Sequence, residues 1–247
     1  MKLIQGDCLV EMQKIPDGSV DMILCDLPYG VTDCKWDTVI PFEPLWVQYK
    51  RIIKDKGAIV LTASQPFTSA LVMSNIKWFK FCWIWNKGLS GSPAVAKYRP
   101  LPISEDILVF GDGKITYNPQ MRKGKMRVKG RKTNGNTGEG VSENWKGLKN
   151  GHYSINDDYF PVNVLDITNA NRRNKVHPTQ KPVALFGYLI KTYTNEGDLV
   201  LDNCMGSGTT GEACFHTGRD FIGIEKDQYW FSYAKDRIEA LTYNELD

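Results

Sequence analysis

Short apolar runs alternate with amphipathic stretches along most of this chain, and that alternation constrains the fold more than any other feature. The apolar runs are 20–25, 57–62, 79–85, 107–110, 199–201 and 221–224. Runs of this length suit strands that are buried on both faces of a sheet. The stretches with helical spacing are 41–54, 66–76, 182–194, 208–217 and 227–241. The alternation predicts a doubly wound α/β fold with a mainly parallel sheet.

The composition fits one sizeable core, or one core that carries a large insertion. With 42% hydrophobic residues among 247, the chain is too apolar to be disordered. Its glycines and prolines show no period, which excludes a collagen-like protein. No apolar run reaches the roughly 18 residues of a membrane helix, and the start is polar by residue 5, unlike a secretory signal. We therefore expect a cytoplasmic protein with no membrane partner, in a bacterial cell or, if phage-encoded, in its host.

The cysteines and histidines predict neither disulfides nor a metal site. Six cysteines lie far apart, at positions 8, 25, 34, 82, 204 and 214, and none forms a C-x-x-C pair. The three histidines are also well separated, at 152, 177 and 216. We expect free thiols in a reducing compartment and no metal.

One segment, 112–159, interrupts the alternation and has no strong periodicity between 112 and about 155. Residues 112–150 carry ten Lys or Arg against three acidic residues, a formal charge of +7. Since the whole chain is only +3, the remainder is −4. Such a segment is either a solvated surface insertion or a positive surface for nucleic-acid phosphates. We expect a discontinuous catalytic domain, 1–111 with 160–247, and an inserted region, 112–159.

A buried strand runs into a glycine turn and then a helix within 198–214. Gly206 and Gly208 allow a tight turn and a close ligand, and the helix start leaves amide donors nearby. The next strand ends at Glu225, whose carboxylate can accept hydrogen bonds from two ribose hydroxyls. These features describe a nucleoside site for NAD, FAD or S-adenosylmethionine, and Gly211 formally completes G-x-G-x-x-G. Asp202, before the turn, would repel a pyrophosphate and attract an ammonium group, which favours S-adenosylmethionine.

An acid, a stiff proline and an aromatic residue follow an early strand in the segment 26–29, Asp-Leu-Pro-Tyr. The carboxyl ends of parallel strands are where α/β proteins bind ligands. A planar amino group can donate one hydrogen to the Asp26 carboxylate and the other to the Leu27 carbonyl, while its base stacks on Tyr29. A simple strand-ending turn is the alternative reading.

Three motifs in this order resemble those of the β group of amino-methylating DNA methyltransferases. Residues 26–29 resemble the D-P-P-Y signature, 177–182 resemble H-P-T-x-K-P, and 202–208 resemble the cofactor loop. Leu27 departs from the usual Pro, but only the backbone carbonyl of that position is used. The resemblance covers nearly the whole chain. It implies a Rossmann-like methyltransferase fold with a mainly parallel seven-stranded sheet, in which 112–159 is the target-recognition region.

The resemblance also implies roles for individual residues. The catalytic set is Asp26, Leu27, Pro28 and Tyr29. The S-adenosylmethionine set is Asp7, Cys8, Asp26, His177, Thr179, Lys181, Asp202, Cys204, Gly206, Ser207, Gly208, Thr209, Thr210 and Glu225. The DNA-binding set combines Trp36 of a K-W-D segment with the basic residues Lys123, Lys125, Arg127, Lys129, Arg131 and Lys132. Residues 104–108 resemble the family's H-E-x-I-L strand, with Ser in place of His.

The reaction that this resemblance implies is methyl transfer from S-adenosylmethionine to adenine N6 at a specific site in double-stranded DNA. The target base must leave the duplex, and the transfer is direct. No Pro-Cys pair is present for carbon-5 cytosine chemistry. Expected partners besides DNA are a second copy of the chain and a cognate restriction endonuclease.

Several alternatives stay open at this point. Cytosine N4 is the nearest, although those enzymes often carry Ser where Asp26 stands. A methyltransferase that acts on RNA or on a protein glutamine is another alternative. The enzymes that act on glutamine carry an N-P-P-Y loop, and this chain has Asp26 in place of its asparagine. A dinucleotide-dependent oxidoreductase would leave 26–29 and the basic segment unexplained. A nucleic-acid-binding module with an inactive cofactor site is the last.

Overall fold

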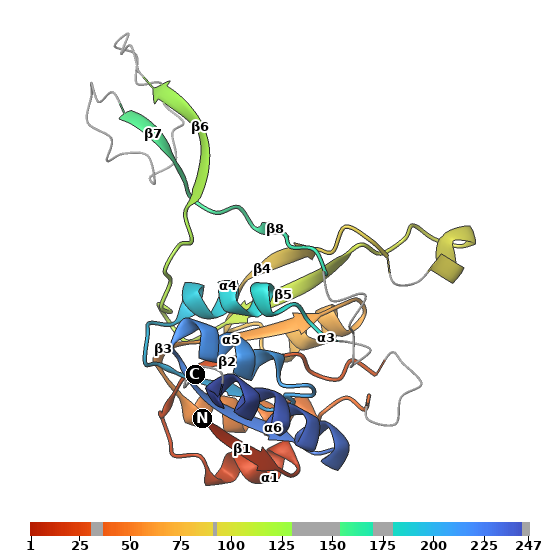
Figure 1. Cartoon of the computed structure of the whole chain (residues 1–247). Coiled ribbons are helices and arrows are strands. Elements are labelled where there is room, and N and C mark those ends of the chain that lie inside the picture. Colours follow the sequence, from red (N-terminus) through yellow and green to blue (C-terminus); the bar gives the residue numbers. More distant parts are fainter. Residues whose placement is uncertain (31–36, 91–92, 130–153, 170–179, 244–247) are drawn as a thin grey trace. The chain divides into compact units, whose positions relative to one another are not determined.

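The computed structural model describes residues 1–30, 37–90, 93–129, 154–169 and 180–243, and a mainly parallel sheet lies at its centre (Figure 1). The strand order is β1-β10-β9-β2-β3-β5-β4-β8, and β5 alone among these is antiparallel to its neighbours, β3 and β4. The strands are β1 (Lys2–Gln5), β2 (Val20–Cys25), β3 (Ile53–Ala63), β4 (Phe79–Asn86), β5 (Ser104–Phe110), β8 (Val164–Asp166), β9 (Leu199–Asp202) and β10 (Asp220–Glu225).

The sheet is mainly parallel, as predicted, but within the described residues it has eight strands where we expected seven. The additional strand is β8, three residues long, which pairs in parallel with β4 at one edge. Neither β8 nor β1, at the opposite edge, was predicted. Both are too short and too exposed to show the continuous apolar pattern of a strand that is covered on two faces.

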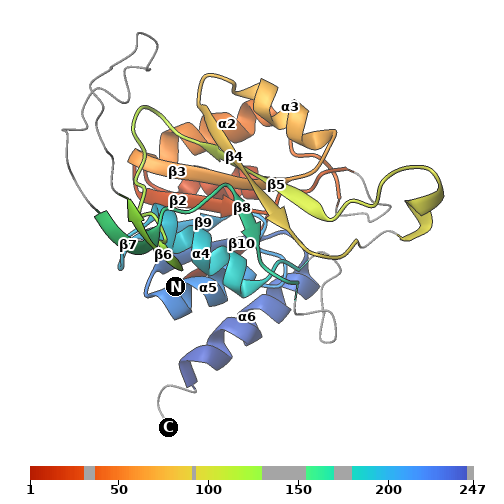
Figure 2. The same ribbon diagram turned by 90° about the horizontal axis from the view of Figure 1, so that it is seen from above.

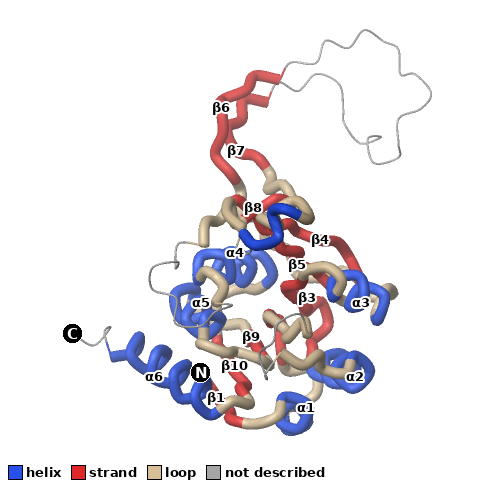
Figure 3. Tube along the Cα trace, turned by 90° about the vertical axis from the view of Figure 1, so that its right-hand side faces the viewer, coloured by secondary structure: helices blue, strands red, loops and turns tan. Residues whose placement is uncertain are grey.

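Helices cover both faces of the sheet, as Figure 2 shows with α2 and α3 on one side and α4, α5 and α6 on the other. The tube in Figure 3 shows the same two layers, with α1 beside α2. The five helices of the predicted stretches are present within a few residues of their expected bounds. The helices are α1 (Cys8–Glu11), η1 (Met12–Lys14), α2 (Phe42–Ile52), α3 (Phe67–Ser74), η2 (Pro93–Lys97), α4 (Val183–Tyr193), α5 (Thr209–Thr217) and α6 (Gln228–Tyr243).

Each face of the sheet has its own hydrophobic core, and strand β2 supplies both. Met22 and Leu24 pack with α4, α5 and α6, whereas Ile23 and Cys25 pack with α1, α2 and α3. All four are fully buried. Burying one such side chain contributes roughly 1.5–3 kcal/mol. This double burial explains why residues 22–25 are continuously apolar.

Residues 119–161 form a second compact unit, separate from 1–118 with 162–247. It contains an antiparallel pair, β6 (Arg122–Lys129) and β7 (Ser154–Tyr159). The Tyr159 hydroxyl donates a hydrogen bond to the Lys125 carbonyl at 2.7 Å. The sequence shows no strong periodicity between 112 and about 155, because glycine and charged residues hide the pattern of these two strands.

Among the described residues, no helix has both the length and the apolar character needed to cross a bilayer. Their His, Cys, Asp and Glu side chains also form no group of three or more that is arranged to hold a metal ion.

Candidate active site

A cavity of about 1060 Å³ opens at the carboxyl ends of β2, β9 and β10. Asp26 follows β2, Asp202 ends β9 and Glu225 ends β10, and all three line the cavity. β2 and β9 are paired, parallel neighbours, so their carboxyl ends meet although they are far apart in sequence. The other predicted residues that line the cavity are Asp7, Cys8, Leu27, Pro28, Tyr29, Lys181, Cys204, Gly206, Ser207, Thr209 and Thr210.

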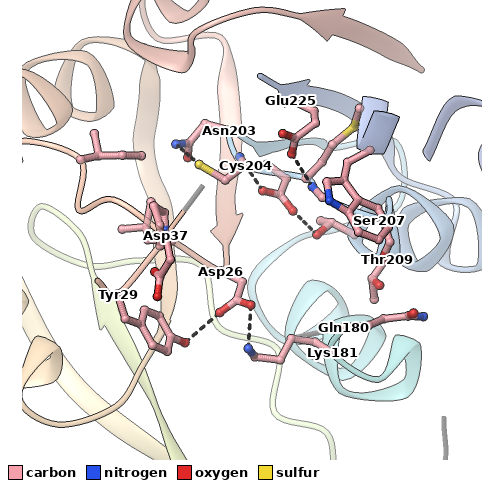
Figure 4. Close-up of a pocket in the computed structure, with 18 of the residues that line it drawn as sticks. Asp26, Tyr29, Asp37, Gln180, Lys181, Asn203, Cys204, Ser207, Thr209 and Glu225 are labelled. Atoms are coloured by element: carbon pink, nitrogen blue, oxygen red, sulfur yellow. Dashed lines mark hydrogen bonds and ion pairs between the residues drawn. The ribbon is translucent and has the colours of Figure 1, made fainter. Parts of the chain in front are cut away.

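Both oxygens of the Asp26 carboxylate accept hydrogen bonds (Figure 4). Oδ1 accepts from the Tyr29 hydroxyl at 2.8 Å and from the Thr62 hydroxyl of β3. Oδ2 accepts from the Lys181 ammonium at 2.6 Å. The carboxylate is therefore fixed from the loop, from β3 and from the segment before α4, while its side chain stays 21% exposed.

Lys181 begins a chain of alternating charges behind Asp26. Its ammonium also lies 3.3 Å from Glu105 Oε2, and Lys87 Nζ lies 3.0 Å from Glu105 Oε1. Burial by itself would lower the pKa of Lys181, but Asp26 and Glu105 raise it above its ordinary value. Burial likewise opposes ionisation of Glu105, yet Lys181 and Lys87 lower its pKa. Both groups are therefore charged at neutral pH.

Tyr29 offers less stacking surface than the sequence suggested. Its ring stacks on Phe67, with centroids 5.1 Å apart and planes 24° apart, so Phe67 covers one face. Burial, followed by the charge of Asp26, raises the pKa of the Tyr29 hydroxyl, which therefore stays protonated and donates. Leu27 is 3% exposed and packs in the core beneath the loop, which accommodates the departure from Pro.

The glycine turn is held by the two carboxylates that flank it. The Gly206 amide donates to Glu225 Oε2 at 2.9 Å, and the Cys204 amide donates to Asp202 Oδ1 at 3.0 Å. The Thr210 hydroxyl donates to the other oxygen of Asp202. Gly208 does not line the cavity. Its φ is 80°, and an added Cβ would lie 3.1 Å from Ala234 Cβ of α6, so its role is to let the turn pack closely.

Asp202 is buried at 3% exposure. Burial raises the pKa of its carboxyl from 3.8 to about 7, although the Thr210 and Cys204 hydrogen bonds oppose the rise. Burial also raises the pKa of Glu225. A desolvated carboxylate of this kind gains from a cationic partner, so the site favours an ammonium or sulfonium group over a phosphate.

Cys8 and Cys204, which line the cavity, and Cys25, which is buried behind it, are poor nucleophiles. The neighbouring Cys204 and burial raise the pKa of Cys8, and burial raises that of Cys25 to about 12. The pKa of Cys204 is raised well above its ordinary value by Cys25. Protonated thiols do not attack, so these groups give no basis for a covalent intermediate.

Asp7 lies at the start of α1, where its side chain already has partners. Oδ1 accepts from the Leu9 amide at 3.0 Å as a helix cap, and Lys226 Nζ lies 3.1 Å from Oδ2. An adenine amino group at Asp7 would have to share this carboxylate with Lys226.

Several cavity residues were not selected from the sequence. Asp37 is 8% exposed and its Oδ1 accepts from the Gly30 amide at 2.8 Å, which closes the loop after Tyr29. Its signal was the K-W-D segment, from which we selected only Trp36. Glu105 was visible within the strand motif 104–108, whereas Lys87 had no motif. Trp36, His177 and Thr179 lie outside the described residues.

The predicted DNA-binding residues fall in the second unit, as far as it is described. Lys123 is exposed, and its ammonium pairs with Asp158 at 2.8 Å and Asp157 at 3.3 Å. Lys125 is exposed, and Arg127 and Lys129 lie on β6. Arg131 and Lys132 lie outside the described residues.

The chain matches a known protein family. The N6/N4 methyltransferase family model, described as "DNA methylase", matches residues 20–236, which include both the Asp26 loop and the glycine turn. The chain belongs to this DNA methylase family. The Asp26 loop and the glycine turn thus line one cavity of a DNA methylase.

Curated relatives of this DNA methylase match it over nearly its whole length. The type II methyltransferase M.HpaI of Haemophilus parainfluenzae is 27% identical over 97% of this chain and 74% of its own. The DNA adenine methyltransferase YhdJ of Escherichia coli is 28% identical over 98% of this chain and 83% of its own. M.HinfI of Haemophilus influenzae is 27% identical over 99% and 70%.

Solved structures share the fold of the DNA methylase. M1.HpyAVI, crystallised as a SAM complex, aligns with a TM-score of 0.63 at 24% identity, covering 96% of this chain and 98% of its own. The cytosine-N4-specific PvuII DNA methyltransferase aligns with a TM-score of 0.67 at 16% identity, covering 95% and 85%. At such identities the likeness concerns the fold.

Proposed function

We propose that this DNA methylase transfers a methyl group from S-adenosylmethionine to adenine N6 at a specific site in double-stranded DNA. The observation that supports the proposal most strongly is the placement of Asp26 in the same cavity as the Asp202–Thr210 turn and Glu225. The carboxylate proposed to bind the target amino group therefore lines the same cavity as the residues proposed to bind a nucleoside that carries a cationic amino-acid group. The named adenine enzyme among the relatives agrees with this choice of base.

The cavity fits S-adenosylmethionine on its own chemistry. Asp202 is a buried carboxylate suited to the ligand's ammonium, and Glu225 stands at the strand end suited to ribose hydroxyls. Asp7 and Cys8 line the same cavity, as expected for residues beside the adenine. When bound, S-adenosylmethionine supplies a methyl group activated by a sulfonium. The roles of His177 and Thr179 remain predictions.

Asp26 orients the target amino group. An exocyclic amine is a weak nucleophile because its lone pair is delocalised into the ring. A hydrogen bond to Asp26, and a second to the Leu27 carbonyl, favour the tetrahedral nitrogen that the new bond requires. Because the Cys8 and Cys204 thiols at the cavity are protonated, we infer that the transfer is direct, with no covalent enzyme intermediate.

The basic unit supplies the affinity for duplex DNA. The residues proposed to contact phosphates are Lys123, Lys125, Arg127, Lys129, Arg131 and Lys132. The segment 112–159 as a whole is proposed to serve target recognition. The target base leaves the stack to reach Asp26. Trp36 is proposed to border the flipped base.

Expression in a methylation-free host, followed by modification-sensitive sequencing, tests the proposal. We expect N6-methyladenine at one defined sequence, and none with Asp26→Ala. N4-methylcytosine at a defined site would instead establish the closest alternative. Unmodified host DNA from an expressed, folded protein would contradict both.

Equilibrium binding separates the methyltransferase from the oxidoreductase that Gly206 and Gly208 also allow. We expect micromolar affinity for S-adenosylmethionine and no measurable affinity for NADH. The reverse result would overturn the methyltransferase assignment. A homodimer, a cognate endonuclease and a cytoplasmic location are additional proposals, which sedimentation, genomic context and cell fractionation test.

A further inference from the structure

Lys181 has a setting that cofactor binding does not explain. It lines the cavity, yet it is 6% exposed and its ammonium contacts two carboxylates, Asp26 at 2.6 Å and Glu105 at 3.3 Å. Lysine is almost never buried unless it is paired, and removing one partner of a buried pair is costly. Figure 4 shows Lys181 directed at Asp26 from the start of α4. The geometry therefore connects Lys181 with the catalytic carboxylate.

Asp26 accepts a hydrogen bond from an amino group most strongly when it is ionised, because an ionised carboxylate only accepts, whereas a protonated carboxyl carries one O–H donor and has fewer acceptor sites. Two acids lie near Asp26, namely Asp202 on β9 and Glu105 on β5. The Cys25 thiol and the Tyr29 hydroxyl, whose pKa values are raised, are neutral at neutral pH. The burial of the site adds to the cost of each negative charge.

The positive charges that offset these acids come from two other elements. Lys181, before α4, contacts Asp26 directly, and Lys87, after β4, reaches it only through Glu105. Thr62 on β3 contributes a neutral hydroxyl to Oδ1. Among the described residues, the cation in contact with Asp26 is thus Lys181.

We propose that Lys181, held in place by Glu105, is a positioning residue that keeps Asp26 ionised and fixes Oδ2 beside the target amino group. A carboxylate has about four lone-pair sites. Tyr29 and Thr62 use Oδ1, and Lys181 uses one site on Oδ2, which leaves a site on Oδ2 for the amino hydrogen. The inference rests on the proposed function in assigning the amino group to Asp26.

A carboxyl titration tests the electrostatic part without DNA or cofactor. The protein is labelled with ¹³Cγ-aspartate, and the Asp26 signal is identified by its loss in Asp26→Asn. Lys181→Met keeps the length of the side chain without its charge, and we expect the Asp26 titration midpoint to rise by at least about one pH unit, a tenfold change in the protonation equilibrium. Glu105→Gln removes an anion and should lower the midpoint.

The opposite signs are the critical result. If Lys181 and Glu105 had a purely structural role, the Asp26 midpoint would move in the same direction in both variants or in neither. That result would overturn the proposal. If Lys181→Met does not fold, Lys181→Gln, which also removes the charge, takes its place in the comparison with Glu105→Gln. Lys181→Arg, which keeps the charge, should titrate like the wild type.

Methyl-transfer rates on DNA test the positioning part. In Lys181→Met we expect the acidic limb of the kcat/KM profile to move to higher pH by at least about one unit, together with the Asp26 midpoint, and kcat/KM to approach the wild-type value above that limb as Asp26 ionises. S-adenosylmethionine affinity should change less than threefold. An equal loss at every pH, or a parallel loss of cofactor affinity, would overturn the proposal. If the wild type methylates no DNA while the two midpoints still move apart, the proposed function fails and the Lys181–Asp26 coupling stands.

Discussion

Asp26 carries the proposed chemistry, and it reaches the target amino group through a single carboxylate. Asp26→Ala should lower methyl transfer by far more than tenfold, which corresponds to a loss above about 1.4 kcal/mol in the transition state. Cofactor binding should stay nearly intact, because the described cofactor turn is held by Asp202 and Glu225 instead. Steady-state kinetics and calorimetric titration with S-adenosylmethionine measure the two effects.

A matched control for this substitution lies on a neighbouring strand. Asp55 is an exposed aspartate near the start of β3, at the end of the strands opposite the cavity. Asp55→Ala should keep wild-type turnover. If Asp26→Ala retained turnover within tenfold, Asp26 would not be the group that orients the amine.

Asp202 illustrates a site residue that costs stability. Its carboxyl has a pKa of about 7 in the folded protein against 3.8 in the unfolded chain. The folded form therefore binds the proton more tightly than the unfolded chain does. The stabilisation that comes from this proton is fully present below pH 3.8 and is lost as the pH rises to about 7, where the buried carboxylate ionises. Asp202→Asn cannot ionise, so its thermal midpoint should exceed that of the wild type by a few degrees at pH 8 and by less at pH 5.

Thermal denaturation at several pH values measures this difference, and cofactor titration provides the second readout. Affinity for S-adenosylmethionine should fall in Asp202→Asn, because the partner of the ammonium group is gone. A variant that is less stable than the wild type at pH 8 would show that the hydrogen bonds to Asp202 outweigh its desolvation.

At the scale of elements, the glycine turn depends on how closely α6 approaches it. Gly208→Ala would place a Cβ 3.1 Å from Ala234 and 3.2 Å from Ile238, at a φ of 80°. The left-handed backbone costs an L-residue about 1–2 kcal/mol, and the close packing adds to that. Urea unfolding should show the loss.

Gly197 provides the control, since it has the same φ of 80° but nothing within 4 Å of an added Cβ. Gly197→Ala should show the backbone cost alone. Equal losses in the two variants would mean that α6 yields to the new methyl group, and that Gly208 is required only for its backbone conformation.

The sequence predicts those elements whose burial leaves a periodic trace. The strands of the central sheet and the helices α2 to α6 have such traces because they pack against one core or between two. The short edge strands β1 and β8 and the charged pair β6 and β7 do not. β1 and β8 are only four and three residues long, and β6 and β7 are mainly polar, so none of the four shows a continuous apolar pattern.

The same logic separates the predicted site residues from the missed ones. Asp26, Asp202 and Glu225 follow from the rule for carboxyl ends of parallel strands. Lys87 and Glu105 reach the cavity for another reason. β5 is antiparallel to β4, so the end of β4 and the start of β5 meet at the cavity edge of the sheet. The direction of pairing is a tertiary property that local patterns do not record.

At the scale of the whole molecule, the charge is concentrated in one segment. Neutralising Lys123, Lys125, Arg127 and Lys129 should weaken DNA binding and flatten its dependence on salt, by a slope of about 0.9 for each lost phosphate contact. Fluorescence anisotropy over a range of salt concentrations measures both. Lys123 should contribute less than its charge suggests, since Asp157 and Asp158 already pair with it.

The control neutralises Lys2 and Lys77, which are both exposed. Lys2 is the first residue of β1 and Lys77 precedes β4, so both lie at the end of the sheet away from the cavity. Their loss should leave the salt slope unchanged. An unchanged slope in the basic variant would make that segment an ordinary solvated surface.

The strand order also governs how the protein is made. β9 and β10 lie between β1 and β2, yet they are synthesised after all the other strands. While the chain emerges from the ribosome, β1 and the facing edge of β2 have no strand partner, and such edges favour misassembly. Closing the sheet brings Asp202 beside β2 in the same step. We therefore expect a nascent chain to have no methyl-transfer activity until β9 and β10 have completed the sheet.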